Sequence, residues 1–257
     1  MPFPAGWLLP DWPAPSNMRA VCTTRAGGVS HGPYESLNFG DHVGDVPDAV
    51  ARNRATFAAA IGARPVFLQQ VHGPHATKLD ANTPNGTEAD GCFTLDRSIA
   101  CTIMVADCLP VLFAAADGKA VAAAHAGWRG LAGEGGRGVI ESVCDSLRKR
   151  TGAQLQETLV WLGPCIGPDV FEVGDEVKAA FAAHDAGAAS MFRPHAANKW
   201  LADLQGLARR RLQALGVTRI YGNDGSREWC TVSNPSRFFS HRRDRVSGRF
   251  AASIWIA

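Results

Sequence analysis

Residues 101–126 read CTIMVADCLPVLFAAADGKAVAAAHA, and in this stretch two apolar runs flank Asp117-Gly118. An Asp-Gly pair between apolar runs is a strong short-range signal for a β-hairpin. We therefore expect strands over 101–115 and 119–126, joined by a two-residue turn. The chain on either side of this hairpin is then expected to build the rest of the sheet around it.

The register of this hairpin decides whether two reactive side chains meet. Counting outward from the turn places His125 opposite Pro110 and Cys108 opposite Gly127. Because side chains alternate between the faces of a sheet, Cys108 and His125 then share a face as diagonal neighbours, about 7–8 Å apart at Cα. A single bulge would reverse one of the two faces, and Pro110 indicates an irregularity near the strand end.

These two residues and a histidine from another segment form a candidate metal-ligand set. His72 lies in the run LQQVHG, and two imidazoles with one thiolate leave a fourth position open, as in catalytic zinc sites. We predict that His72, Cys108 and His125 bind zinc, with copper as the alternative metal. How His72 reaches the other two cannot be read from sequence spacing.

The neighbours of these residues favour a site over inert packing, although a free cysteine in an apolar strand is usually a packing residue. Asp107 stands beside Cys108 in an otherwise apolar run, where an ionised group is costly unless it is paired. We expect Cys108, Asp107 and His125 to be the catalytic residues, with Asp107 moving a proton or orienting a ligand.

Arginine and aromatic residues are the candidates for substrate binding. Arginine suits bidentate capture of phosphate or carboxylate, and an aromatic ring can stack on a base. We expect an anion pocket with a stacking residue supplied by Trp128 or by Phe238 and Phe239. The predicted substrate-binding residues are Arg25, Trp128, Arg129, His241, Arg242 and Arg243.

A series of long motifs, in this order, resembles one bacterial family. The strings are TTRAGGVS, YESLNFG, LQQVHG, ADCLPVLF, AAHAGWRG, WLGPCIGP, FEVGDEV, FFSHRRD and GRFAASIWI, and they cover nearly the whole chain. The resemblance is to the YfiH-type family, variously described as multicopper polyphenol oxidoreductase (laccase-like), purine nucleoside phosphorylase and peptidoglycan editing factor. His72, Cys108 and His125 match that family's metal-binding set, whereas His241 stands where many relatives carry tyrosine.

The resemblance implies a compact α/β sandwich and a zinc-dependent purine nucleoside phosphorylase that also has adenosine deaminase activity. Its substrates would be a purine nucleoside and phosphate, and the choice of purine comes from the resemblance alone. An open metal position can activate water or orient a substrate.

Three other functions stay open. The first is a metal-independent amide hydrolase acting on a peptidoglycan precursor, with Cys108 as nucleophile and His125 as base. The second is copper polyphenol oxidation, although coupled copper centres need more than the eight histidines of this chain and no His-x-His occurs. The third is a non-catalytic ligand-binding protein.

Composition limits the class of protein. The chain has 257 residues, 46% of them hydrophobic, and no linker or repeat divides it, so we expect one catalytic domain over 1–257. A net charge of +2 is too small to indicate nucleic acid or an anionic membrane as partner. No secretion signal or membrane span is evident, and seven scattered cysteines indicate reduced thiols. We expect a cytoplasmic protein, with a monomer favoured.

Secondary-structure patterns predict an α+β fold, a mixed β-sheet with helices packed outside. Helical spacing of apolar residues predicts helices over 47–61, 137–150, 174–184 and 199–215. Strands besides the hairpin are expected at 19–24, 65–71, 157–162, 218–222 and 249–256.

The glycine-rich segment 133–138 matches the GxGxxG pattern of dinucleotide-binding proteins. No strand is expected to end directly before it, so a dinucleotide site is disfavoured. The N–H groups at the start of the following helix could still bind a phosphate.

Overall fold

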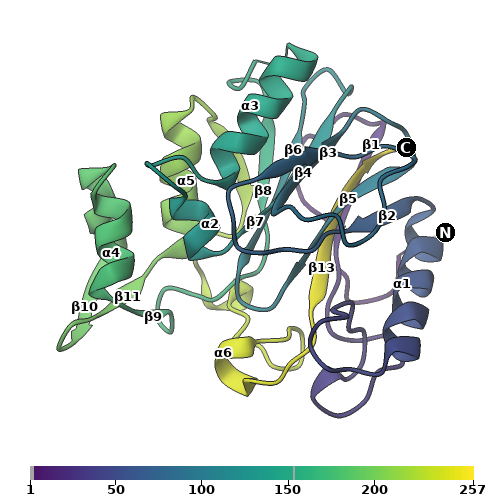
Figure 1. Ribbon diagram of the computed structural model, residues 1–257, viewed down its shortest axis with the longest axis horizontal. Coiled ribbons are helices and arrows are strands. Elements are labelled where there is room, and N and C mark those ends of the chain that lie inside the picture. The colour runs from purple at the N-terminus through teal and green to yellow at the C-terminus, as the bar shows by residue number, and fades with distance from the viewer. Residues whose placement is uncertain (1–2, 153) are drawn as a thin grey trace.

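The computed structural model describes residues 3–152 and 154–257 and consists of two stacked β-sheets with helices on both outer faces. Figure 1 shows the sheets between two groups of helices, with α2 (Trp128–Ala132), α3 (Val139–Thr151) and α5 (Leu204–Ala214) on one side and α1 (Pro47–Ile61) on the other. The larger sheet has the order β12-β8-β6-β7-β4-β3. Its strands are β3 (Ala76–Lys78), β4 (Gly91–Thr94), β6 (Leu109–Ala114), β7 (Val121–Ala126), β8 (Leu159–Leu162) and β12 (Arg219–Gly222). The predicted α+β sandwich is confirmed.

The smaller sheet has the order β1-β13-β5-β2 and mixes parallel with antiparallel pairs. Its strands are β1 (Met18–Cys22), β2 (Arg64–Phe67), β5 (Ile99–Val105) and β13 (Phe250–Ile256). Its outer face is covered by α1, which spans Pro47–Ile61. The predicted bounds of α1 are confirmed, because Pro47 begins the helix and Gly62 ends it in the left-handed conformation, φ 63°.

The hairpin has the predicted register. In the β6–β7 pair Leu109 lies opposite Ala126 and Pro110 opposite His125. The connection is wider than the two-residue turn that we expected, since pairing stops at Ala114 and Val121. The register survives because the extra residues are added equally on both sides of the turn.

The strand predicted over 101–115 is wrong in one respect, because it is two strands in different sheets. Ala106, Asp107 and Cys108 carry the chain from β5 in the smaller sheet to β6 in the larger one. Asp107 has a φ of 96°, a conformation that no β-strand allows. A continuous apolar run conceals this break, since both strands are buried on both faces and show no alternation.

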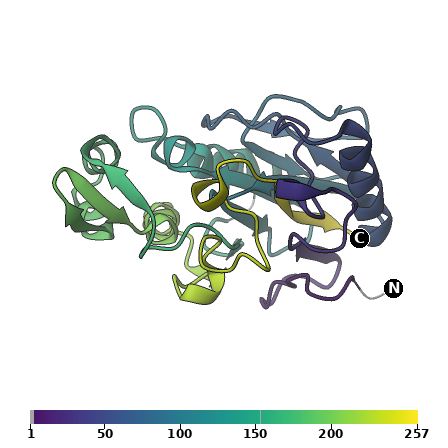
Figure 2. The same ribbon diagram turned by 90° about the horizontal axis from the view of Figure 1, so that it is seen from below.

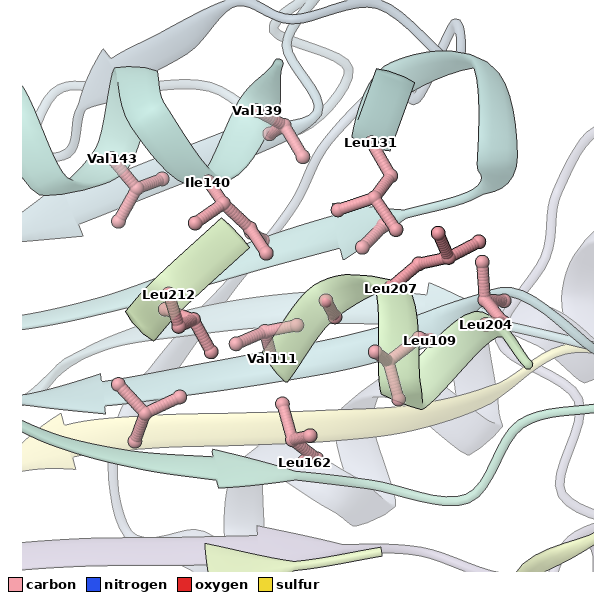
Figure 3. Packing of buried hydrophobic residues seen from close by; sticks show 14 of the residues in the cluster. Leu109, Val111, Leu131, Val139, Ile140, Val143, Leu162, Leu204, Leu207 and Leu212 are labelled. Atoms are coloured by element: carbon pink, nitrogen blue, oxygen red, sulfur yellow. The ribbon is translucent and has the colours of Figure 1, made fainter. Parts of the chain in front are cut away.

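The hydrophobic core fills three spaces between the four layers. Alternate residues of β6 divide between two of them, with Val111 and Phe113 facing the helices and Leu112 and Ala114 facing the smaller sheet. Figure 3 shows the first space, with side chains of α3 (Val139–Thr151) and α5 (Leu204–Ala214) set against strand residues such as Val111 and Leu162. The third space lies between α1 and the smaller sheet.

A small three-stranded sheet extends from one end of the molecule, away from both termini (Figure 2). It contains β9 (Glu172–Gly174), β10 (Phe192–Ala196) and β11 (Lys199–Ala202), with α4 (Asp175–Ala182) beside it. The helix predicted over 199–215 is therefore wrong at its start. Residues 199–202 form β11, and the Asp203 side chain caps α5 by accepting a hydrogen bond from the Gly206 N–H.

The remaining helical segments are short, and the sequence patterns did not predict them. They are α2 (Trp128–Ala132), α6 (His241–Asp244) and the 3₁₀ turns Gly32–Tyr34, Ala186–Met191 and Arg227–Trp229. Within the described ranges, every helix is too short or too polar to cross a lipid bilayer.

Candidate metal centre

Three side chains from two separate segments meet at one end of the β6–β7 hairpin. Cys108 directly precedes β6, His125 lies near the end of β7, and His72 comes from the loop after β2. Their ligand atoms all lie within 4.8 Å of one another. Cys108 Sγ is 3.7 Å from His72 Nε2, and the two imidazole rings lie edge to face with centroids 4.7 Å apart. The hairpin register places Cys108 and His125 on the face that is turned towards the smaller sheet.

The donor set fits a single tetrahedral metal ion. Zinc–sulfur and zinc–nitrogen bonds of about 2.3 and 2.0 Å at a tetrahedral angle put the two ligand atoms about 3.5 Å apart. The observed separation of Cys108 Sγ and His72 Nε2, 3.7 Å, is close to this value. His125 Nδ1 is already engaged, so its Nε2 is the ring nitrogen left for a metal.

Asp90 connects the two histidines, and the sequence analysis did not find it. Its carboxylate accepts a hydrogen bond of 2.7 Å from His125 Nδ1. The same carboxylate accepts the backbone N–H groups of Val71, His72 and Gly73, which form the loop that carries the other histidine. A carboxylate behind a metal-binding histidine fixes the tautomer and orientation of the ring. The available signal was an aspartate directly before the apolar segment 91–94.

The electrostatics of the cluster favour a thiolate. Burial alone would raise the pKa of the Cys108 thiol, but the charge of His125 and hydrogen bonds from both histidines lower it to about 6. Burial would lower the pKa of His125, but Cys108 and Asp90 raise it to about 9. Burial likewise opposes ionisation of Asp90, yet its hydrogen bonds with His125 and with the backbone of residues 71 and 73 hold its pKa below the usual value.

Two glycines of the motif Gly127-Trp-Arg-Gly130 allow the His72 loop to approach. A Cβ added at Gly127 would lie 2.8 Å from His72 Cδ2 and 3.0 Å from Cys108 Sγ. A Cβ added at Gly130 would lie 2.9 Å from the Gly73 carbonyl oxygen. Both distances are shorter than ordinary carbon contacts, so the glycines let the start of α2 pack directly on the candidate ligands.

The three side chains open into a pocket of about 390 Å³. Its lining combines apolar residues, such as Met104 and Ile166, with several cationic side chains. Positive φ values, uncommon for residues other than glycine, occur at His72, Asp107 and Arg245, all of which line the pocket. Such strained backbone is often found at functional sites, where the surrounding structure holds it in place.

Asp107 lies in this lining but its carboxylate is turned towards the protein. One oxygen accepts a hydrogen bond of 2.6 Å from the Thr231 hydroxyl, and the other accepts the Arg242 backbone N–H at 2.6 Å. These bonds stabilise the positive φ at the junction between β5 and β6. Asp107 therefore holds α6 beside the pocket, and the ligand-orienting contact expected of it is made by Asp90 instead.

Of the six predicted substrate-binding residues, four line the pocket and two do not. Trp128, Arg129, His241 and Arg242 belong to the lining. The side chain of Arg25 instead donates to the carbonyl groups of Glu35 and Pro235. Arg243 likewise donates to the carbonyl groups of residues 231, 232 and 238 and pairs with Asp244. The predicted anion pocket is corrected accordingly, because these two guanidinium groups are used to hold loops together.

The aromatic prediction also needs correction. Phe238 and Phe239 are fully buried in the core, so neither can stack on a substrate. Trp128 and Phe171 are the aromatic residues of the lining. Lining residues that the sequence patterns did not predict include His42, Gln70, Phe171, Arg245 and Arg249.

The glycine-rich segment 133–138 does not offer a free helix N-terminus. Gly138 precedes α3, and its N–H donates to the Glu141 carboxylate at 2.8 Å. The other oxygen of Glu141 pairs with Arg211. A carboxylate of the chain itself therefore occupies the position where a phosphate would bind.

Among the described residues, the fold and the site define a class, an α/β sandwich with a His-Cys-His cluster in the lining of a pocket that also contains several arginines. Residues 19–257 match the family described as multi-copper polyphenol oxidoreductase laccase. A relative from Pseudomonas aeruginosa, named a purine nucleoside phosphorylase, is 49% identical and is covered over 98% of its length, with 97% of this chain matched. The Escherichia coli relative YfiH, also named a purine nucleoside phosphorylase, is 45% identical over the same shares.

Solved structures agree with this assignment. A Neisseria meningitidis protein of the DUF152 family is 43% identical with a TM-score of 0.91, and the match covers 98% of this chain and 99% of that one. YlmD from Geobacillus stearothermophilus is 30% identical with a TM-score of 0.88, covering 100% and 98%. The chain therefore belongs to the YfiH family of laccase-like multi-copper polyphenol oxidoreductases, and the resemblance seen in its motifs is confirmed.

Proposed function

We propose that this chain is a zinc-dependent purine nucleoside phosphorylase that also deaminates adenosine. The observation that carries the proposal is the convergence of His72, Cys108 and His125 in the lining of a pocket that also contains arginines. The names of the two relatives from Pseudomonas aeruginosa and Escherichia coli supply the reaction class. The pocket volume, about 390 Å³, lies within the range of small-molecule sites.

In this proposal, residues of the pocket would bind phosphate, stack on the base and orient a metal ligand. Arg129 and Arg242 would bind phosphate through charge-assisted hydrogen bonds. Trp128 and Phe171 would flank the base, because they offer aromatic surface within the lining. Asp90 would keep His125 oriented by holding its Nδ1 proton. A zinc ion bound by the three ligands would supply Lewis-acid polarisation of an oxygen atom.

The test of phosphorolysis is its dependence on phosphate. Cleavage of adenosine or inosine should require inorganic phosphate and yield ribose 1-phosphate. Equal cleavage to free ribose without phosphate would contradict the proposal. Adenosine deamination should be measured separately, as inosine formation in phosphate-free buffer, and it should be lost together with phosphorolysis when the metal is removed.

Copper polyphenol oxidation is less well supported by the ligand arrangement. In the described part of the chain, His72, Cys108 and His125 are the one group of three or more potential ligands close enough to share a metal. Coupled copper centres require further histidine clusters. A single copper ion at this site would support weak oxidation at most.

A specific observation favours a cysteine-based amide hydrolase as the second candidate. Cys108, His125 and Asp90 are arranged in the order of a nucleophile, a base and an orienting carboxylate. This candidate predicts that amide hydrolysis persists after chelation of the metal and that an acyl substrate traps Cys108 covalently. Loss of both activities with intact ligand binding would point to the non-catalytic alternative.

We also propose that residues 1–257 act as one catalytic domain and as a cytoplasmic monomer. The matched relatives are covered over almost their whole length, and the seven cysteines are free thiols, which is typical of a reducing compartment. Sedimentation velocity at micromolar concentration would test the monomer directly.

A further inference from the structure

The pocket contains an unusual concentration of arginines without carboxylate partners. Arg129, Arg242, Arg245 and Arg249 all belong to its lining. Among the described residues, none of the four forms an ion pair with an acidic side chain. Elsewhere the chain does pair its arginines, as with Arg210 and Asp185 or Arg211 and Glu141.

Three of these arginines, Arg242, Arg245 and Arg249, come from one short segment, residues 242–249. We call these three side chains the arginine wall. Arg242 is the second residue of α6, Arg245 directly follows α6, and Arg249 directly precedes β13. Arg242 donates to the Glu172 carbonyl, and Arg249 donates to the carbonyl groups of residues 247 and 248. These neutral acceptors hold the side chains without cancelling their charge.

Partly buried hydrogen bonds hold the backbone of the wall segment in place. Asp107 accepts the Arg242 backbone N–H, and the Ser240 side chain accepts the Arg243 backbone N–H. The Arg243 guanidinium binds carbonyl groups of residues 231, 232 and 238. The arginine side chains are thus presented by a supported backbone, which lowers the entropy lost when they bind a ligand.

The charge of the pocket exceeds what one inorganic phosphate would neutralise. Four arginines share the lining with two anionic groups, the Asp107 carboxylate and the Cys108 thiolate, and a zinc ion held by the cluster would add two further positive charges. A phosphate group carries about two negative charges at neutral pH. Positive charge would therefore remain uncompensated with a neutral nucleoside and one phosphate in place.

We propose that the pocket also binds nucleoside 5′-monophosphates, with the ester phosphate on the arginine wall. This inference rests on the proposed function for the nucleoside half of the ligand, while the phosphate half rests on the arginines. A bound monophosphate occupies the space of the nucleoside and thereby inhibits phosphorolysis competitively. The site then responds to the ratio of phosphorylated to free nucleosides.

The test is isothermal titration calorimetry of the zinc-loaded protein with inosine 5′-monophosphate and with inosine, in buffer free of phosphate, where inosine can be neither deaminated nor phosphorolysed. The monophosphate should bind at least about tenfold more tightly than inosine, because its phosphate gains charge-assisted hydrogen bonds. In Arg245→Ala, affinity for the monophosphate should fall about tenfold while affinity for inosine changes less than about twofold. Arg245 is exposed, so its replacement leaves the core intact.

Arg52→Ala is the matched control, since it removes one exposed positive charge from α1 outside the pocket and should change neither affinity. Equal affinity of the two ligands, or equal weakening of both in Arg245→Ala, would overturn the inference. Insensitivity of monophosphate binding to Arg245→Ala would also overturn it, because binding would then come from the metal alone. Phosphorolysis is assayed separately, so monophosphate binding without phosphorolysis refutes only the proposed function.

Discussion

The metal-ligand cluster and the arginine wall face the same pocket but are built in opposite ways. In the cluster each polar group has a partner, since Asp90 binds His125 and the His72 loop, and Cys108 contacts both histidines. In the described part of the chain, Arg242, Arg245 and Arg249 of the wall form no ion pair with a carboxylate, and the guanidinium groups of Arg242 and Arg249 donate to backbone carbonyls. The cluster is suited to one metal ion, whereas the charge of the wall is suited to an anionic ligand.

This difference separates two kinds of functional residue. Buried groups of the cluster depend on each other, so removing one should disturb the others strongly and without regard to substrate. Arg245 of the wall is exposed and Arg242 and Arg249 are partly buried, and each side chain can be removed on its own, so the effects should be smaller and specific to anions. The predictions below test this separation, from the largest expected effect to the smallest.

Loss of a ligand should have the largest effect. His72→Ala, Cys108→Ala and His125→Ala should each lower zinc occupancy and phosphorolysis by orders of magnitude, because each empties one coordination position. Metal analysis and initial rates measure the effect, and circular dichroism should show an unchanged fold. Full zinc occupancy in Cys108→Ala would rule out the assignment of this ligand.

Asp90→Asn should have the second-largest effect on metal binding. The amide keeps the size of the side chain but loses the negative charge that His125 and the three backbone N–H groups use. Zinc affinity, measured by competition with a chelator, should fall about 10- to 100-fold. Asp48→Asn, in the exposed first turn of α1, is the control and should leave zinc affinity unchanged. Unaltered affinity in Asp90→Asn would mean that this carboxylate does not organise the ligands.

Replacing two adjacent arginines, Arg242 and Arg243, should affect different properties, substrate binding in one case and stability in the other. Arg242→Ala should raise the KM for phosphate about tenfold with a small change in thermal stability, since its guanidinium lines the pocket. Arg243→Ala should instead lower the Tm by about 5 °C, because several hydrogen bonds to backbone carbonyls are lost. Kinetics and thermal unfolding of both variants decide this, and a reversed outcome would contradict the assigned roles.

Gly127→Ala should have the smallest effect on metal binding. The added methyl group would press on His72 and Cys108 and should weaken zinc binding about threefold to tenfold. Gly73→Ala is the matched control in the facing loop, where the new Cβ meets nothing nearer than 3.6 Å. Equal zinc affinities of the two variants would show that the close approach of Gly127 is unimportant.

Much of the cluster could be predicted from the sequence because local rules determine it. The register of β6 and β7 follows from the turn at Asp117-Gly118 and the apolar runs, and it brings Cys108 and His125 to one face. The α+β class and the bounds of α1 likewise follow from spacing and capping residues. The position of His72 beside them depends on the Asp90 network, which joins segments that no local pattern connects.

The arginine wall could be predicted only in part. Arg242 and Arg243 are neighbours in a turn, and nothing in the sequence shows which one faces the pocket and which one binds carbonyl groups behind it. The break at Asp107 was hidden for a related reason, since β5 and β6 are buried on both faces and form one continuous apolar run. Tertiary contacts with Thr231 and α6 decide the conformation there.

X-ray absorption spectroscopy at the metal edge, on protein purified without added metals and of known metal content, tests the central claim most directly. One metal ion per chain, with one sulfur neighbour at about 2.3 Å and two imidazole nitrogens at about 2.0 Å, is the predicted result. A spectrum without a sulfur neighbour, or one that shows a second metal nearby, would contradict a single site formed by His72, Cys108 and His125.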